Sequence, residues 1–162
     1  MLKLILFGLL SQIAVAGELE GEWYVGGGFG VFTKYVSRLK TLNFGRKLET
    51  RDSNPFKLLI DVGYYDDSRP NRNPSLTVAA LVGPELKNNF GYISLFSGPG
   101  VLAAPDPTMG GPFQFFHELS IGIIDYNTQL KLGGFCRHIS NAGIYNRNEG
   151  KDFCGFKFHF GF

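Results

Sequence analysis

Three residue types that together can cleave an ester lie near the C-terminal end of the chain. His138 and Ser140 are separated by one residue, and Asp152 follows after a short polar segment. On a β-strand, side chains two positions apart lie on the same face as neighbours. A serine, a histidine and a carboxylate that meet can act as nucleophile, general base and orienting group. The alternative is that these are ordinary polar residues of a hairpin tip.

The segments that carry these residues have the period-2 alternation of apolar and polar side chains that is typical of β-strands. The alternation is clearest at the end of the chain, where every second residue from Cys154 to Phe162 is apolar. Asp152 shares this parity and is expected on the same face. The pattern predicts eight strands, near residues 22–33, 35–48, 55–66, 74–85, 89–98, 112–125, 128–140 and 152–162.

Such alternation fits either a soluble sandwich or a membrane barrel, whose apolar face contacts lipid. Composition suits short strands, with 16 Phe, 7 Tyr and 22 Gly, and no apolar run after residue 20 is long enough for a membrane helix. Aromatic residues at predicted strand ends favour the barrel, as interfacial girdles do. They are Trp23, Tyr24, Phe90, Tyr92, Phe113 and Phe162. The sequence therefore predicts an all-β, eight-stranded antiparallel transmembrane β-barrel.

An even strand number returns both chain ends to the periplasmic side. Segments 49–54, 86–88 and 126–127 are then predicted periplasmic turns. Segments 67–73, 99–111 and 141–151 are predicted outer loops, and the Gly- and Pro-rich stretch from Gly98 to Pro112 is assigned to a surface loop.

The N-terminal segment predicts export. A short basic start, an apolar run and Ala14-Val15-Ala16 indicate a cleaved signal peptide over residues 1–16, leaving residues 17–162 as one barrel domain. The alternative is an N-terminal anchor. An exported chain meets an oxidising environment, in which Cys136 and Cys154 can pair.

Several function classes lack support in the sequence. A net charge of +2 gives no nucleic-acid signature, and two cysteines do not make a structural zinc site. The run Gly26–Gly30 lacks the Lys-Ser/Thr of a phosphate loop, so we assign it to a strand. No Gly-x-Ser-x-Gly elbow is present to support an α/β-hydrolase.

Residues 137–152 carry a more specific pattern. His-x-Ser-Asn-Ala-Gly is followed by Asn-x-Gly-x-acid just before the last strand. This pattern resembles the lipid A 3-O-deacylase family, eight-stranded outer-membrane barrels that hydrolyse the 3-position ester of lipid A. Signal peptide, size, strand count and terminal Phe162 agree with that resemblance.

The resemblance implies Ser140 as nucleophile, His138 as base and Asp152 as orienting acid. The family's acid is typically Glu, so Glu149 stays open as the alternative acid. Asn141, Gly143 and Asn148 also match the motif, and Asn148 is the expected oxyanion donor. No metal or cofactor is implied.

The implied setting is the bacterial outer membrane. Lipid A or lipopolysaccharide is the expected substrate, membrane lipid and the barrel assembly machinery are the expected partners, and a homodimer is left open. The alternative functions are a non-catalytic outer-membrane barrel (structural, adhesive or small pore) and a soluble secreted sandwich that binds a ligand.

Two further histidines are assigned structural positions. His117 falls on the lipid-facing parity of its strand. The residue two positions further on is Leu119, which cannot act as a nucleophile, so His117 is interpreted as an interfacial histidine. His159 alternates with phenylalanines and is predicted to face the lumen. Basic residues in or beside outer loops, which could hold lipid A phosphates, are Arg69, Arg72, Arg147 and Lys151.

The last hairpin has a predicted register. Catalysis needs His138 beside the acid, which favours His138 opposite Asp152. Antiparallel partners have a constant sum of residue numbers, so Cys136 then lies opposite Cys154. Directly opposed side chains have Cβ atoms within about 5.5 Å, which allows a cross-strand disulfide beside the site.

Overall fold

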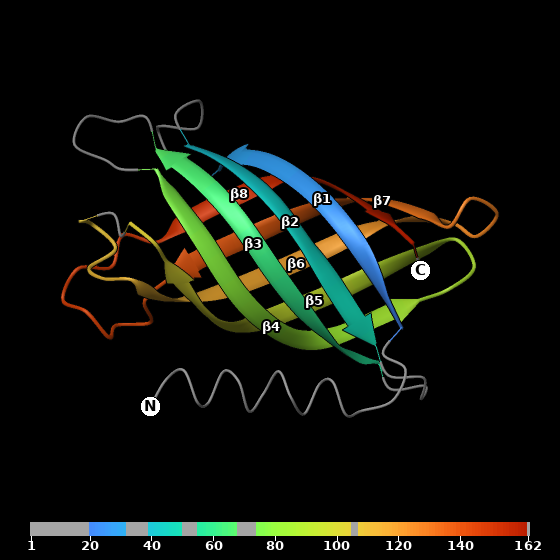
Figure 1. Cartoon of the computed structure of the whole chain (residues 1–162), viewed down its shortest axis with the longest axis horizontal. Helices are drawn as coiled ribbons and strands as arrows, with labels where there is room; N and C mark the ends of the chain where they lie inside the picture. The colour runs from blue at the N-terminus through green and yellow to red at the C-terminus, as the bar shows by residue number, and fades with distance from the viewer. Residues whose placement is uncertain (1–19, 32–38, 50–54, 68–73, 105–106, 162) are drawn as a thin grey trace.

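The computed structural model describes residues 20–31, 39–49, 55–67, 74–104 and 107–161, which form a closed antiparallel barrel (Figure 1). The predicted signal peptide and Phe162 lie outside the described residues. Among those described, no helix is long and apolar enough to cross a membrane. The strands are β1 (Glu20–Gly30), β2 (Leu39–Glu49), β3 (Phe56–Asp67), β4 (Ser75–Lys87), β5 (Gly91–Leu102), β6 (Phe113–Asp125), β7 (Leu130–Ser140) and β8 (Lys151–Phe160).

Each strand pairs with the next, and β1 closes the barrel against β8. The predicted class and strand number are confirmed. The short turns after β4 and β6 lie at the end of the barrel where β8 finishes, and segment 141–150 and the described residues between β5 and β6 lie at the other end (Figure 1). Longer loops are typical of the extracellular end of an outer-membrane barrel. We call this the loop end.

The fifth strand is longer than the sequence predicts. We assigned Gly98 to Pro112 to a loop, but β5 continues to Leu102, with Pro99 opposite Phe115 of β6. The ladder to β4 has a gap here, between the pairs Ala79–Gly100 and Val82–Ser97. A proline, which has no N–H, is tolerated in a strand where one side is already unpaired. The assignment of Gly98 to Pro112 to a loop, which was based on its Gly and Pro content, was therefore wrong for residues 98–102.

The barrel has an apolar outside and a polar inside. Outward side chains such as Leu76 and Ile121 are 58% and 64% exposed. The predicted strand parities are thus confirmed. Tyr24 and Tyr92, which we predicted at the membrane interface, are instead 0% and 4% exposed inside the barrel, because they sit on the inward parity of β1 and β5.

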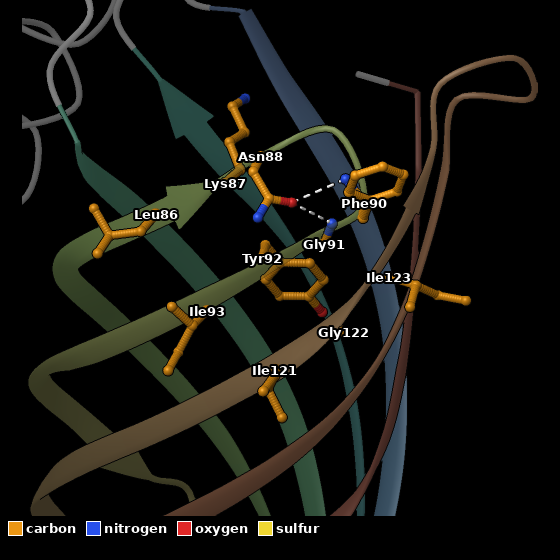
Figure 2. A pocket seen from close by; sticks show the side chains of 10 residues that line it. All are labelled: Leu86, Lys87, Asn88, Phe90, Gly91, Tyr92, Ile93, Ile121, Gly122 and Ile123. Atoms are coloured by element: carbon orange, nitrogen blue, oxygen red, sulfur yellow. Dashed lines mark hydrogen bonds between the residues drawn. The ribbon is translucent and has the colours of Figure 1, made fainter.

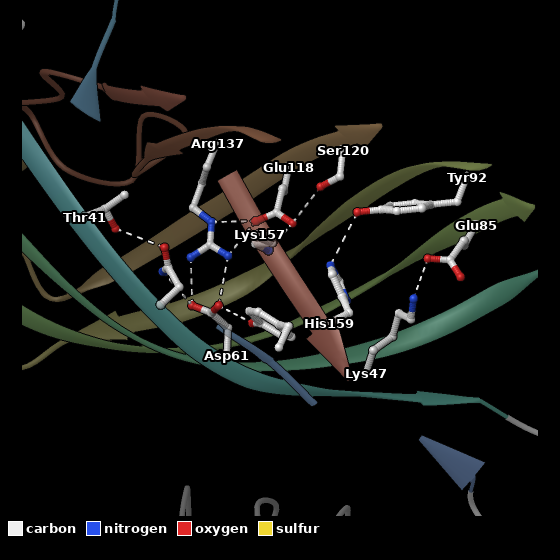
Figure 3. A network of polar contacts seen from close by, with 12 residues as sticks. Thr41, Lys47, Asp61, Glu85, Tyr92, Glu118, Ser120, Arg137, Lys157 and His159 are labelled. Carbon is white, nitrogen blue, oxygen red and sulfur yellow. Dashed lines mark hydrogen bonds and ion pairs between the residues drawn. The ribbon is translucent and has the colours of Figure 1, made fainter. Parts of the chain in front are cut away.

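Buried ion pairs fill the lumen (Figure 3). Arg137 bonds both carboxylate oxygens of Asp61, at 2.7 and 2.9 Å, and approaches Glu118 at 2.6 Å. Glu118 also pairs with Lys157. A second cluster joins Lys47 and Lys131 to Glu22 and Glu85. His159 bonds Glu22 at 3.0 Å, which confirms that it faces the lumen.

Candidate functional site

A row of four polar side chains crosses the outer wall near the loop end. The strand registers put Ser97 of β5 opposite His117 of β6, His117 opposite His138 of β7, and His138 opposite Asp152 of β8. The register predicted for the last hairpin is therefore confirmed. Polar residues on this wall are unusual, since its other side chains are mostly apolar.

His138 and Asp152 are in direct contact. The imidazole Nδ1 lies 2.8 Å from Asp152 Oδ1, and the two side chains are 43% and 39% exposed on the outside of the barrel. A carboxylate accepts a hydrogen bond from Nδ1–H, which leaves Nε2 of the neutral ring as a proton acceptor. The pair therefore presents a base to the lipid side of the wall.

Gly150 packs against the edge of this imidazole. A Cβ added to Gly150 would lie 2.7 Å from His138 Cε1 and 3.4 Å from Nε2. Contacts this close require the ring to move. The glycine of the Asn-x-Gly-x-acid pattern thus has a physical reason: it lets the loop pass beside the base.

Ser140 ends β7 two positions beyond His138, on the same outward parity, and is 8% exposed. Its partner across the ladder is Phe115 of β6. Among the described residues, none forms a hydrogen bond with Ser140 Oγ. Hydrogen bonds of a catalytic pair are often incomplete without substrate. The strand geometry places Ser140 beside His138, and the described structure has no hydrogen bond between Ser140 Oγ and the imidazole.

A tight turn follows Ser140, and Asn141 holds it. The buried Asn141 amide donates to the carbonyls of Met109, at 2.9 Å, and Arg147, at 2.5 Å. Its Oδ1 accepts the Gly143 N–H at 2.8 Å. Ala142 and Gly143 have φ of 50° and 82°, the left-handed conformation that such a turn needs. Asn141 and Gly143 thus act on loop shape.

Asn148 has a different position. Its Oδ1 accepts the backbone N–H of Asn141 at 3.0 Å, next to Ser140. Within the described part of the chain, Asn148 Nδ2 has no acceptor. An amide N–H₂ group fixed beside the serine is thus available to an oxygen of a bound ester.

A shallow hollow of about 220 Å³ lies on the wall below the histidines. Leu95 and Leu119 line it, and the disulfide between Cys136 and Cys154, with Cα atoms 4.1 Å apart, forms part of its surface. The predicted pairing of the two cysteines across the hairpin is confirmed, and the bond between them, which the sequence left open, is present in the structure. This hollow joins an apolar surface to His138 and Asp152.

A larger hollow of about 470 Å³ lies at the opposite end of the barrel, beside the β4–β5 turn (Figure 2). Apolar side chains dominate its lining, including Leu86, Phe90 and Ile123. None of the predicted site residues borders it, so its size does not make it the candidate site.

Ser97 is a residue that the sequence analysis missed, and His117 is one that it placed but did not connect to the site. Ser97 Oγ lies 2.8 Å from His117 Nδ1. The ring of His117 lies alongside that of His138, with centroids 6.2 Å apart and planes 25° apart. We searched for a partner of His117 along its own strand, whereas the partners lie across the sheet. Only the β5–β6–β7 register brings them together.

The loop-end charges differ in part from expectation. Lys151 begins β8 directly beside the outer loop, as expected, but its side chain is buried, with Nζ 3.2 Å from Asp67, and does not point to the outer surface. Glu149, the alternative acid, has its carboxylate 3.9 Å from Lys151 Nζ, while Asp152 is the carboxylate that bonds His138. Arg147 is exposed in segment 141–150, and Arg69 and Arg72 lie outside the described residues.

Comparisons with known proteins agree with this architecture. The model of the family described as lipid A 3-O-deacylase (PagL) matches residues 56–160. Among solved structures, the crystal structure of the outer membrane enzyme PagL superposes with a TM-score of 0.64 at 15% identity, covering 87% of this chain and 99% of that one. No curated protein matches the chain significantly. Because the family model spans most of the chain, this protein belongs to the lipid A 3-O-deacylase family.

Proposed function

We propose that this protein is a serine esterase that removes the 3-position acyl chain of lipid A in the outer leaflet of the bacterial outer membrane. The observation that carries the proposal is the hydrogen-bonded pair of His138 and Asp152 on the lipid-facing wall. Ser140 lies two positions beyond His138 on the same strand. A structural role gives no reason for a partly exposed His–Asp pair beside lipid. A serine esterase that acts on a lipid can use such a pair as its base and orienting acid.

In the proposed reaction, His138 Nε2 accepts the proton of Ser140 as Oγ attacks the ester carbonyl carbon. Asp152 stabilises the imidazolium that forms. As the bond between the carbonyl carbon and the sugar oxygen breaks, the imidazolium donates its proton to that oxygen, which departs as a hydroxyl and leaves the acyl group on Ser140. Water, activated by the same imidazole, hydrolyses the acyl-serine and releases the fatty acid.

The carbonyl oxygen gains negative charge during each attack. Asn148 Nδ2 is the proposed donor to this oxygen, because its Oδ1 is already engaged with Asn141 N–H. A preorganised donor of this kind contributes about 3–4 kcal/mol to transition-state stabilisation. Asn141 and Gly143 have a supporting role in the proposal, since their own polar groups shape the turn.

Two further features support an enzyme acting on a lipid. The apolar hollow beside His138 is suited to the acyl chain next to the scissile ester. The lumen is filled by buried ion pairs around Arg137 and Lys47, so nothing described there favours a small pore.

The decisive experiment is incubation of the purified protein in detergent with lipid A that carries a 3-position ester. Mass spectrometry should detect two products: lipid A that has lost one acyl chain, and one equivalent of free hydroxy fatty acid. A folded Ser140→Ala protein should release none. Cleavage by that variant at the wild-type rate would contradict the assignment of the nucleophile.

A further inference from the structure

The hydrogen bond between Ser97 and His117 has no part in the reaction described above, yet it lies in the same row as the triad. Ser97 Oγ and His117 Nδ1 are 2.8 Å apart. Both side chains are on the outward parity of their strands, in surroundings of apolar side chains such as Leu95 and Leu119. A polar pair on a lipid-facing wall costs free energy unless its members satisfy one another or serve a function.

The position of His117 relative to His138 suggests that function. Asp152 holds His138 from β8 at Nδ1, and Gly150 lies against the Cε1–Nε2 edge. His117 lies on the remaining side, across the β6–β7 ladder, with its ring nearly parallel to that of His138. One hydrogen bond alone lets an imidazole swing about the bond axis. A second ring beside it limits that movement.

We propose that His117 is a positioning residue that keeps the His138 imidazole aimed at Ser140, and that Ser97 fixes His117 in turn. The inference rests on the proposed esterase function and extends its machinery to four strands. The hydrogen bond between Ser97 Oγ and His117 Nδ1 fixes the orientation of the His117 ring.

The test uses a fluorophosphonate, which reacts with an activated serine and does not require lipid A. Wild-type protein in detergent is labelled, and the rate of labelling at Ser140 is followed by intact mass and peptide mapping. His117→Ala should slow labelling about 10- to 100-fold, the usual cost of losing alignment of a catalytic group. With lipid A as substrate, kcat should fall by a similar factor while KM changes by less than about threefold.

Two companion variants separate positioning from general damage. His117→Phe keeps a flat ring beside His138 and should recover most of the labelling rate lost in His117→Ala. Ser97→Ala removes only the hydrogen bond and should fall between wild type and His117→Ala. Ile121→Ala, on the lipid-facing side of the same strand but far from the row, is the matched control and should label at the wild-type rate.

Each further outcome is decisive. Unchanged labelling of Ser140 in a folded His117→Ala protein overturns the inference and leaves the proposed function intact. Label on Ser97 in the Ser140→Ala protein also overturns it, because Ser97 is then itself a nucleophile. Absence of label from Ser140 in the wild-type protein contradicts the serine-esterase proposal, and the inference fails with it.

Discussion

At the scale of single residues, the aspartate at position 152 is the main departure from the family pattern. Aspartate is one methylene shorter than the usual glutamate, yet its carboxylate reaches His138 at 2.8 Å. The register explains this, since the two residues are directly opposed and opposed Cβ atoms lie within about 5.5 Å. The shorter side chain therefore reaches far enough to form this hydrogen bond.

Asp152→Asn tests the role of this acid. The amide can hold the ring but does not stabilise an imidazolium as a carboxylate does, so kcat for lipid A deacylation should fall by about 10²-fold or more. Residual activity should remain measurable above that of Ser140→Ala. Full activity of Asp152→Asn, with Glu149→Gln inactive, would transfer the role to the alternative acid.

Gly150→Ala tests how closely the ring is held. The added methyl group would meet His138 Cε1 at 2.7 Å and displace the base, so kcat should fall about 10- to 100-fold. Gly134→Ala is the matched control on the neighbouring strand, because its Cβ would meet only Gly155 O at an ordinary 3.8 Å. An active Gly150→Ala protein would show that the ring has room to move.

At the scale of elements, the hairpin of β7 and β8 carries the three residues of the proposed triad, His138, Ser140 and Asp152, and the disulfide crosses it. Cys136 and Cys154 are opposed two positions from the pair of His138 and Asp152. A covalent link at this point excludes any other register of the two strands. A slip by one residue would turn the site into the lumen.

Replacement of both cysteines by alanine should therefore lower stability more than activity. The closed loop of 18 residues corresponds to about 3 kcal/mol of chain entropy in the unfolded state. The unfolding temperature of the Cys136→Ala/Cys154→Ala protein in detergent should fall, while kcat below that temperature should stay within about threefold. Reduction of the wild-type protein should reproduce the shift, and an unchanged unfolding temperature would argue against a stabilising bond.

At the scale of the whole molecule, the buried charges inside the barrel hold its wall together. Arg137 of β7 reaches across the lumen to Asp61 of β3 and also pairs with Glu118 of the neighbouring strand β6. Its neighbour on β7 is His138, which faces outward. The strand that presents the base to lipid is thus anchored inside by its adjacent residue.

Arg137→Met should be strongly destabilising, because it leaves Asp61 as a buried charge without its cation, at a cost of about 3–5 kcal/mol. The double variant Asp61→Asn/Arg137→Met should recover part of this loss, since Glu118 keeps Lys157. Unfolding in urea, followed by the gel shift of the folded barrel, measures both. Equal stability of the single variant and the wild type would contradict a structural role for the network.

The sequence by itself determined the fold class, the alternation of most strands, the last hairpin's register and the adjacency of Cys136 and Cys154. These properties follow from local alternation and from constraints between adjacent strands, which the linear sequence records. It misplaced the end of β5 because Pro99 resembles a loop residue, and it placed Tyr24 and Tyr92 on the wrong face.

Only the tertiary structure decided which side chains meet across several strands. Ser97 and His138 are far apart in sequence. His117 lies between them only because β5, β6 and β7 pair in the register that the structure shows. The positions of Asn141 and Asn148 are likewise set by loop contacts with Met109 and with the turn after Ser140. Such contacts form only when the barrel closes and its loops pack against it. The local alternation of apolar and polar residues does not show which distant residues will then meet.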